Sequence, residues 1–261
     1  MRSKSSVFQI VVVVFFIIGL SILHTGNVWA EQELTVSAAA SLTNAFPEIG
    51  KKFESANPGT KILFNFAASG PLLQQIEQGA PVDVFASADQ KTMDQAKEKK
   101  LILNDSRKDF VSNGLVLIVP PASKISIRSV QDLNTKDVTR VALGKPETVP
   151  VGRYTREALT NEGLWESLSP KFIPGNSVRQ VLDYVTRGEV DAGFVFATDA
   201  AIAKDKVRIV ATLEKHKPIV YPVAIVAATQ KRELAQRFID FVLGKEGQEI
   251  LSQYGFEKPQ V

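Results

Sequence analysis

Two short segments near the start of the chain each place a serine directly after an apolar run that ends in very small residues. The segments are Leu34–Ser41, with the sequence LTVSAAAS, and Ile62–Ser69, with the sequence ILFNFAAS. Small residues let a ligand approach the backbone, and a serine at the start of a helix offers a hydroxyl beside N–H groups that have no acceptor within the helix. We call each of these connections, in which a strand ends in small residues and a helix begins, a corner. Because helix starts of this kind hold anions, the two corners predict an oxyanion site.

The sequence around these corners alternates strand and helix patterns, which predicts an α/β fold. After Ser41, apolar residues recur at helical spacing until Asn57-Pro-Gly59, and Pro71 and Gly79 mark the start and end of a second helix. Further strands are expected at 82–86, 115–119, 141–143, 172–173, 192–196, 207–213 and 221–228, and further helices at 89–100, 151–161, 177–187, 231–243 and 245–254.

An internal similarity favours two lobes. Gly79–Ser87 resembles Gly188–Thr198, since in both a helix ends at glycine, a Val-Asp pair enters a strand, and the strand leaves through Phe-Ala and a hydroxyl residue. Any helix-to-strand connection of an α/β protein can look like this, and that alternative stays open. Ligands of α/β sheets bind outside the carboxyl ends of the strands, which is where the small-residue corners are expected.

The first thirty residues have the features of a cleavable signal peptide. Arg2 and Lys4 precede an apolar run from Val7 to Leu23, and Val28-Trp-Ala30 offers a cleavage site before Glu31. An uncleaved membrane anchor is the alternative, because the run approaches the roughly 18 apolar residues of a membrane span. The chain has no cysteine, so it is neither a lipoprotein nor disulfide-bonded. We therefore expect a soluble periplasmic protein.

The charge of the mature chain is close to balanced. Without Arg2 and Lys4 the 31 basic residues fall to 29, against 28 acidic residues, which gives a net charge of +1. No basic stripe with interleaved aromatic residues is present, so we expect no nucleic acid partner.

The second half of the chain contains two more corners of the anion-binding kind. In Glu147–Gly152, a proline and a glycine precede a helix and leave backbone N–H groups exposed. In Asn176–Arg179, Asn176 or Ser177 caps a helix whose first turn exposes the N–H of Val178. Four helix starts, two in each lobe, are thus predicted to face one cleft.

At this point the sequence resembles a known family, the periplasmic molybdate-binding proteins that deliver molybdate or tungstate to an ABC importer. The segments that carry the resemblance, in order, are Ala38–Asn44, Phe66–Ser69, Gln75–Pro81, Ser87–Lys91, Pro146–Pro150, Gly193–Asp199, Tyr221–Ala224 and Tyr254–Phe256. The resemblance implies an α/β fold of the two-lobed, type II periplasmic binding protein class. It places lobe 1 at 31–111 plus 224–261 and lobe 2 at 112–223, with the expected strands at 115–119 and 221–228 as the crossings.

The resemblance also implies a set of ligand contacts. Ser41 and Ser69 would contribute the hydroxyl and the backbone N–H, and Val151 and Val178 the backbone N–H alone. The fifth contact of the family is a tyrosine hydroxyl, but Phe196 stands at that position. A hydrogen bond lost from a charged group costs roughly 1.5–3 kcal/mol unless water or a neighbour such as Thr198 replaces it.

Other residues invite different interpretations. Arg153 is expected to be solvated or paired rather than to reach the anion, and Asp83 and Asp191 to accept hydrogen bonds from turn backbone rather than to form an acid/base pair. His216 is the one histidine of the mature chain and lies in a loop-like segment, so no bare metal ion is expected.

These observations predict a solute-binding protein rather than an enzyme. Neutral N–H and O–H donors stabilise a dianion in a closed cleft, and a fixed ring of donors favours molybdate or tungstate over the smaller sulfate and over hydrogen phosphate, which must itself donate. We expect no cofactor, a monomer, and a membrane permease as partner. The alternatives are another oxyanion such as sulfate, or an exported hydrolase that uses Ser41 or Ser69 as nucleophile.

Overall fold

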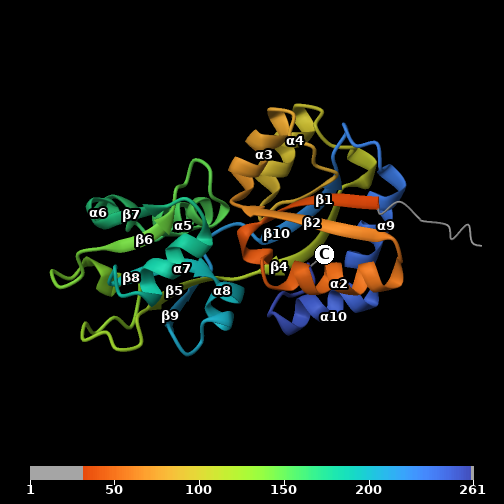
Figure 1. The fold of residues 1–261 in the computed structure, drawn as a ribbon. Coiled ribbons are helices and arrows are strands. Elements are labelled where there is room, and N and C mark those ends of the chain that lie inside the picture. Colours follow the sequence, from red (N-terminus) through yellow and green to blue (C-terminus); the bar gives the residue numbers. More distant parts are fainter. Residues whose placement is uncertain (1–31, 260–261) are drawn as a thin grey trace, which may run out of the picture. The chain divides into compact units, whose positions relative to one another are not determined.

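The computed structural model describes residues 32–259, whose backbone forms two five-stranded mixed sheets with helices packed on them (Figure 1). The first sheet has the order β2-β1-β3-β10-β4 and the second the order β7-β6-β8-β5-β9. The strands of the first sheet are β1 Gln32–Ala39, β2 Thr60–Ala67, β3 Val84–Ala86, β4 Lys108–Asn113 and β10 Ile219–Ile225. Those of the second are β5 Leu115–Val119, β6 Val141–Gly144, β7 Phe172–Gly175, β8 Ala192–Phe196 and β9 Arg208–Leu213. The predicted α/β class is confirmed.

The two sheets share one plan. In each, the first three strands of the order run parallel to one another, and the last two pairings are antiparallel. The similar segments Gly79–Ser87 and Gly188–Thr198 lead into β3 and β8, which are the third strands of their sheets. The similarity seen in the sequence therefore corresponds to equivalent places in two sheets of the same plan.

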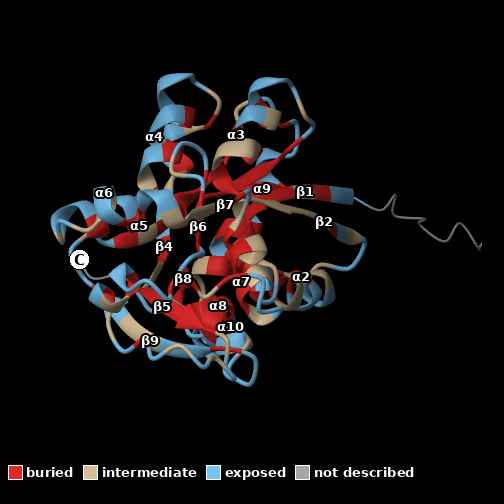
Figure 2. Cartoon of the chain, turned by 90° about the vertical axis from the view of Figure 1, so that its left-hand side faces the viewer, coloured by how far each residue is buried: buried red, intermediate tan, exposed pale blue. Residues whose placement is uncertain are grey.

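Helices cover the sheets with their apolar faces inward, and the buried residues in Figure 2 follow the strands and these faces. In the first half of the chain the helices are α2 Ala45–Ala56, α3 Ser69–Glu77 and α4 Gln90–Glu98. In the second half they are α5 Pro150–Asn161, α6 Trp165–Leu168, α7 Val178–Thr186, α8 Ala197–Ile202, α9 Arg232–Leu243 and α10 Lys245–Gln253. Short 3-10 turns lie at Ala40–Leu42, Asn104–Ser106, Gln131–Asn134 and Ser169–Lys171. The apolar spacing of α2 buries Phe46, Ile49 and Phe53, as its sequence predicted.

The chain passes between the sheets at two short connections. β4 of the first sheet leads through Gly114 into β5 of the second, and residues 214–218 return the chain from β9 to β10. The sequence analysis missed β4, because only Phe110 and Val111 of its six residues are buried and its composition is that of a polar loop. The strands expected to cross, 115–119 and 221–228, instead each lie within one sheet, and the second of them ends at Ile225.

The predicted lobe limits remain a prediction. They fall inside β4 and β10, both of which pair within the first sheet along their lengths, and the contacts of the described residues join them into one unit. The signal peptide predicted at 1–30 lies outside the described residues. Among residues 32–259, no helix has the length and apolar character needed to span a bilayer.

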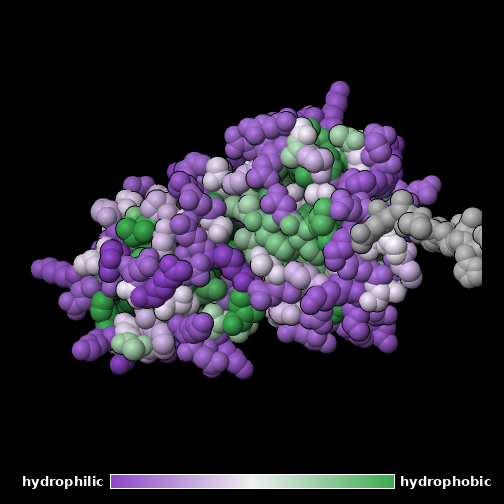
Figure 3. Space-filling view, viewed as in Figure 1, coloured by the Kyte–Doolittle hydropathy of each residue, from purple (hydrophilic) through white to green (hydrophobic). Residues whose placement is uncertain are grey.

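The face shown in Figure 3 is mostly hydrophilic, with its broadest hydrophobic area over the region of β2 and smaller hydrophobic spots elsewhere. β2 is an edge strand on which the half-buried rings of Phe64 and Phe66 stack, with their centroids 5.4 Å apart. Beneath it, Phe46 and Phe238 pack edge to face as part of the main hydrophobic core. This core runs through both sheets and fixes the loops at the carboxyl ends of their strands.

Candidate functional site

The candidate site forms where parallel strands of both sheets end. In the first sheet, β1, β2 and β3 are followed by the corners of Ser41, Ser69 and Ala88. In the second sheet, β6 and β7 are followed by the corners of Val151 and Val178, and β8 ends at Phe196. Because parallel strands end at the same edge of a sheet, each sheet contributes three small or apolar corners to one place.

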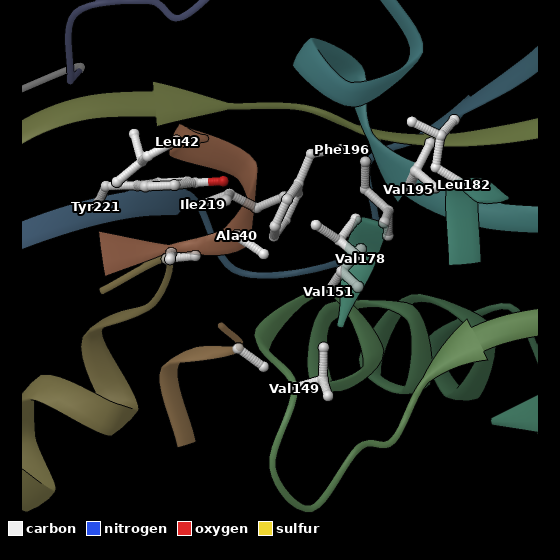
Figure 4. Close-up of a cluster of buried hydrophobic side chains, with 14 of the residues drawn as sticks. Ala40, Leu42, Val149, Val151, Val178, Leu182, Val195, Phe196, Ile219 and Tyr221 are labelled. Atoms are coloured by element: carbon white, nitrogen blue, oxygen red, sulfur yellow. The ribbon is translucent and has the colours of Figure 1, made fainter. Parts of the chain in front are cut away.

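These corners line a single small cavity. Its volume is about 10 Å³, roughly the space that one water molecule needs. All residues that line it are uncharged: Ala39, Ala40, Ser41, Ala68, Ser69, Ala88, Val149, Pro150, Val151, Val178 and Phe196. Figure 4 shows the ring of Phe196 between Tyr221 on one side and Val151 and Val178 on the other. The structure thus brings together all five residues singled out in the sequence, and their role in binding stays a prediction.

Four backbone N–H groups at the cavity belong to first turns of helices. Ser69 and Val178 are the first residues of α3 and α7, Val151 is the second residue of α5, and Ser41 lies in the 3-10 turn after β1. An N–H group in a first turn has no acceptor within its own helix. The four groups are therefore free of helical bonds where they meet the cavity, and helix N-termini favour negative charge.

Both serine hydroxyls have a neighbour on the protein side. The backbone N–H of Ala88 donates to Ser69 Oγ at 3.0 Å, so the proton of Ser69 is not needed for this bond. Ser41 Oγ lies 2.9 Å from the hydroxyl oxygen of Tyr221. The distance alone does not show which of the two hydroxyls donates. Ser41 and Ser69 are 3% and 0% exposed, and both residues line the cavity.

Two contacts bridge the cavity near α3 and α5. The N–H of Gly70 donates to the carbonyl oxygen of Thr148 at 3.1 Å, which joins the start of α3 to the loop before α5. Arg153 on α5 reaches Asp89, the N-cap of α4: its Nε donates to Asp89 Oδ2 at 2.7 Å, and its Nη2 donates to Thr92 Oγ1 at 2.8 Å. Arg153 is paired, as predicted, and the pair joins helices that pack on different sheets.

Arg179 makes a third bridge. Its Nη1 donates to Asn44 Oδ1 at 2.7 Å and its Nη2 to the carbonyl oxygen of Ser41 at 3.2 Å, while its Nε lies 2.6 Å from Asp199 Oδ1. The Nε contact is an ion pair by distance without the alignment of a hydrogen bond. Burial raises the pKa of Asp199 to about 6, and the charge of Arg179 opposes this rise. This carboxylate neutralises the guanidinium nearest the corner of Ser41.

The remaining sequence expectations concern residues away from the cavity. Asp83 accepts from the N–H of Thr35, and Asp191 accepts from the N–H groups of Thr139 and Arg140, as predicted for aspartates that satisfy backbone. The ring nitrogens of His216 lie 2.7 and 2.8 Å from two carbonyl oxygens, so this histidine is not placed as a base for either serine. Within residues 32–259, no cluster of three or more metal-ligating side chains occurs.

Thr198, named in the sequence analysis as one possible replacement for the hydroxyl missing at Phe196, is bonded elsewhere. Thr198 Oγ1 accepts from Asn113 Nδ2 at 2.9 Å and does not line the cavity. The sequence analysis also missed the place of Tyr221, whose ring packs against Phe196 with centroids 5.8 Å apart. The segment Tyr221–Ala224 stood out in the sequence, but only the pairing of β10 with β3 and β4 brings it beside Ser41.

Comparison with known proteins agrees with this architecture. A family model described as "Bacterial extracellular solute-binding protein" matches residues 34–257, which is nearly all of the described chain. The chain belongs to this family. Several molybdate-binding proteins are similar to this chain along most of their length.

Three relatives define the similarity. The molybdate-binding protein ModA of Escherichia coli (strain K12) is 40% identical over 245 residues, which covers 91% of this chain and 94% of the relative. The ModA protein of Haemophilus influenzae is 36% identical over 232 residues, covering 87% and 91%. The solved periplasmic molybdate-binding protein of Azotobacter vinelandii is 25% identical, has a TM-score of 0.78, and aligns over 87% of this chain and 100% of its own. This solute-binding protein therefore shares its two-sheet fold with periplasmic binding proteins.

Proposed function

We propose that this protein captures molybdate or tungstate in the cavity between its two sheets and delivers the oxyanion to an ABC importer. The observation that carries the proposal is a cavity with an uncharged lining that includes four residues at helix starts, two of which are serines. Such a site offers donors to a dianion without a counter-ion. The similarity to the molybdate-binding proteins of Escherichia coli and Haemophilus influenzae supports the same ligand.

The donor set favours a larger, fully ionised tetrahedral anion. Donors held at fixed positions on opposite walls match one ligand radius, and a smaller anion such as sulfate would leave some of them unpaired. Hydrogen phosphate carries a proton that needs an acceptor, whereas the free groups at this site are donors. Size and protonation thus both favour molybdate and tungstate over sulfate and phosphate.

Calorimetric titration of the protein with sodium molybdate, tungstate and sulfate tests this proposal. We expect molybdate and tungstate to bind at least about 100-fold more tightly than sulfate, because an unpaired buried donor costs about 1–3 kcal/mol and more than one would be left unpaired. A thermal scan at 100 times the dissociation constant should show a stabilisation of about 2.7 kcal/mol without turnover. Sulfate binding as tight as molybdate binding would reject the proposed selectivity.

Capture requires the two sheets to close on the ligand, and the bridging contacts support this step. Within residues 32–259, the chain crosses between the sheets at two short connections, which can act as a hinge. The bonds of Gly70, Arg153 and Arg179 join the two sides of the cavity. Since these bonds form only where the walls meet, they stabilise the closed form that holds the oxyanion.

Replacing Arg153 by methionine tests the contribution of its pair to closure. The pair with Asp89 is largely buried, so Arg153→Met should weaken molybdate binding about 5- to 30-fold, corresponding to roughly 1–2 kcal/mol. The matched control is Lys99→Met, which removes an exposed pair with Glu77 and should change affinity little. Equal titration curves for Arg153→Met and the wild type would show that the pair does not contribute to closure.

The partner and the compartment follow from the same proposal. We propose that the closed protein docks on a membrane permease and acts in the periplasm, after export through the signal peptide expected at residues 1–30. Fractionation of cells that express the full chain should place the cleaved protein in the periplasmic fraction. Retention of the uncleaved chain in the membrane fraction would favour the anchor instead.

A further inference from the structure

The hydroxyl of Tyr221 lies within hydrogen-bond distance of Ser41, which lines the candidate site. Its neighbours define which way its proton points. Tyr221 is 0% exposed and belongs to β10, an inner strand of the first sheet between β3 and β4. Its hydroxyl oxygen lies 2.9 Å from Ser41 Oγ and 3.1 Å from Asn113 Nδ2. Figure 4 shows the hydroxyl directed from Tyr221 toward Phe196 and Ala40, the side on which the cavity lies.

The orientation of the Asn113 amide fixes the first bond of this series. Its Oδ1 accepts from the backbone N–H of Gly114 at 2.9 Å and lies 3.4 Å from that of Thr198, and both of these groups are donors only. The other end of the amide must therefore be the NH2 group. Asn113 Nδ2 donates to the hydroxyl oxygen of Tyr221 and to Thr198 Oγ1.

The second bond follows from the first. Because the Tyr221 oxygen accepts from Asn113, its own buried proton needs an acceptor, and Ser41 Oγ is the protein atom within reach. Burial raises the pKa of Tyr221 well above its ordinary value, so the hydroxyl keeps this proton. If Ser41 donated to Tyr221 instead, the phenol proton would be buried without a partner.

We infer that Tyr221 is a positioning residue for the oxyanion site, which donates to Ser41 Oγ and thereby leaves the Ser41 proton for the ligand. The inference rests on the proposed function. Ser69 is arranged in the same way, since the N–H of Ala88 donates to its Oγ, so the two serines are both set as donors. Tyr221 thus orients the hydroxyl that Ser41 offers, while its ring packs against Phe196, which offers no donor.

A double-mutant cycle between Tyr221 and Ser41 tests this role. In the wild-type background, Tyr221→Phe should weaken molybdate binding about tenfold, because Ser41 loses the bond that orients its proton. In the Ser41→Ala background, the same substitution should change affinity less than about twofold, because the serine through which it acts is gone. Tyr154→Phe is the matched control: this buried ring also packs against Phe196, but its hydroxyl does not reach Ser41.

The outcomes separate the inference from the function. Equal losses in the two backgrounds, or no loss in the wild-type background, would overturn the role of Tyr221 while leaving molybdate binding intact. A wild-type protein that does not bind molybdate would instead overturn the proposed function. If Tyr221→Phe fails to fold, proton NMR of the wild-type complex decides: the slowly exchanging Tyr221 hydroxyl proton should contact the Ser41 β-protons, and a Ser41 hydroxyl proton directed at the Tyr221 ring would overturn the inference.

Discussion

Replacing Gly70 by alanine should prevent the cavity from closing and so remove most of the affinity for molybdate. A Cβ atom at Gly70 would overlap the carbonyl oxygen of Thr148 and lie 3.0 Å from Thr148 Cα on the opposite wall. Both are backbone atoms, so the wall itself must move. Such overpacking costs about 3 kcal/mol or more, which corresponds to an affinity at least about 100-fold weaker by titration calorimetry.

Without ligand, this substitution should not destabilise the fold on either side of the cavity. Gly70 is the second residue of α3, where alanine is the better helix former by about 1 kcal/mol. The melting temperature without ligand should therefore stay the same or rise, while stabilisation by molybdate is lost. Gln74→Ala, at an exposed position of the same helix, is the control and should bind as the wild type does. Wild-type affinity in Gly70→Ala would show that binding does not need the contact with Thr148.

Replacing Val178 by proline should remove one ligand donor and leave its helix in place. Val178 is the first residue of α7, where proline is well accommodated because the missing N–H has no helical acceptor. The preceding residue, Ser177, has φ −157° and ψ 165°, the extended conformation required before proline. A lost hydrogen bond to a charged ligand costs about 1.5–3 kcal/mol, so affinity should fall about 10- to 150-fold.

A second helix start provides the control for this proline. Lys245 is the first residue of α10, its side chain is exposed, and Gly244 before it has φ −70° and ψ 171°. Lys245→Pro therefore makes the same backbone change away from the cavity and should leave the affinity unchanged. Val178→Pro with unchanged affinity and an unchanged melting temperature would show that the N–H of Val178 is not a ligand donor.

Much of the fold could be predicted from the sequence, because its signals are local. The apolar spacing of α2, Pro71 and Gly79 around α3, and the short buried strands of both sheets follow from periodicity and turn chemistry. The polar edge strand β4 could not be predicted in this way, because its composition has no apolar strand pattern. Its pairing with β10 stabilises it as a strand instead.

The corners of the site were also local signals. A serine or a proline after small residues at a helix start indicates N–H groups without a helical acceptor. This signal does not depend on the tertiary structure. The side chain of Val178 gives no sign of binding, yet Ser177 beside it indicates the helix start, and its side chain does accept from the N–H of Gln180. The sequence thus determined the residue types at the corners and the absence of a hydroxyl at Phe196.

Only the tertiary structure decided which groups face one another. The N–H of Gly70 meets Thr148, Arg153 meets Asp89, and Tyr221 meets Ser41 across 180 positions of sequence. No local pattern encodes such pairs, because they arise from the order of the strands and from the approach of two sheets. Hydrogen-bond direction depends in turn on every neighbour of a buried hydroxyl, which is why the link from Asn113 through Tyr221 to Ser41 emerged only from the folded chain.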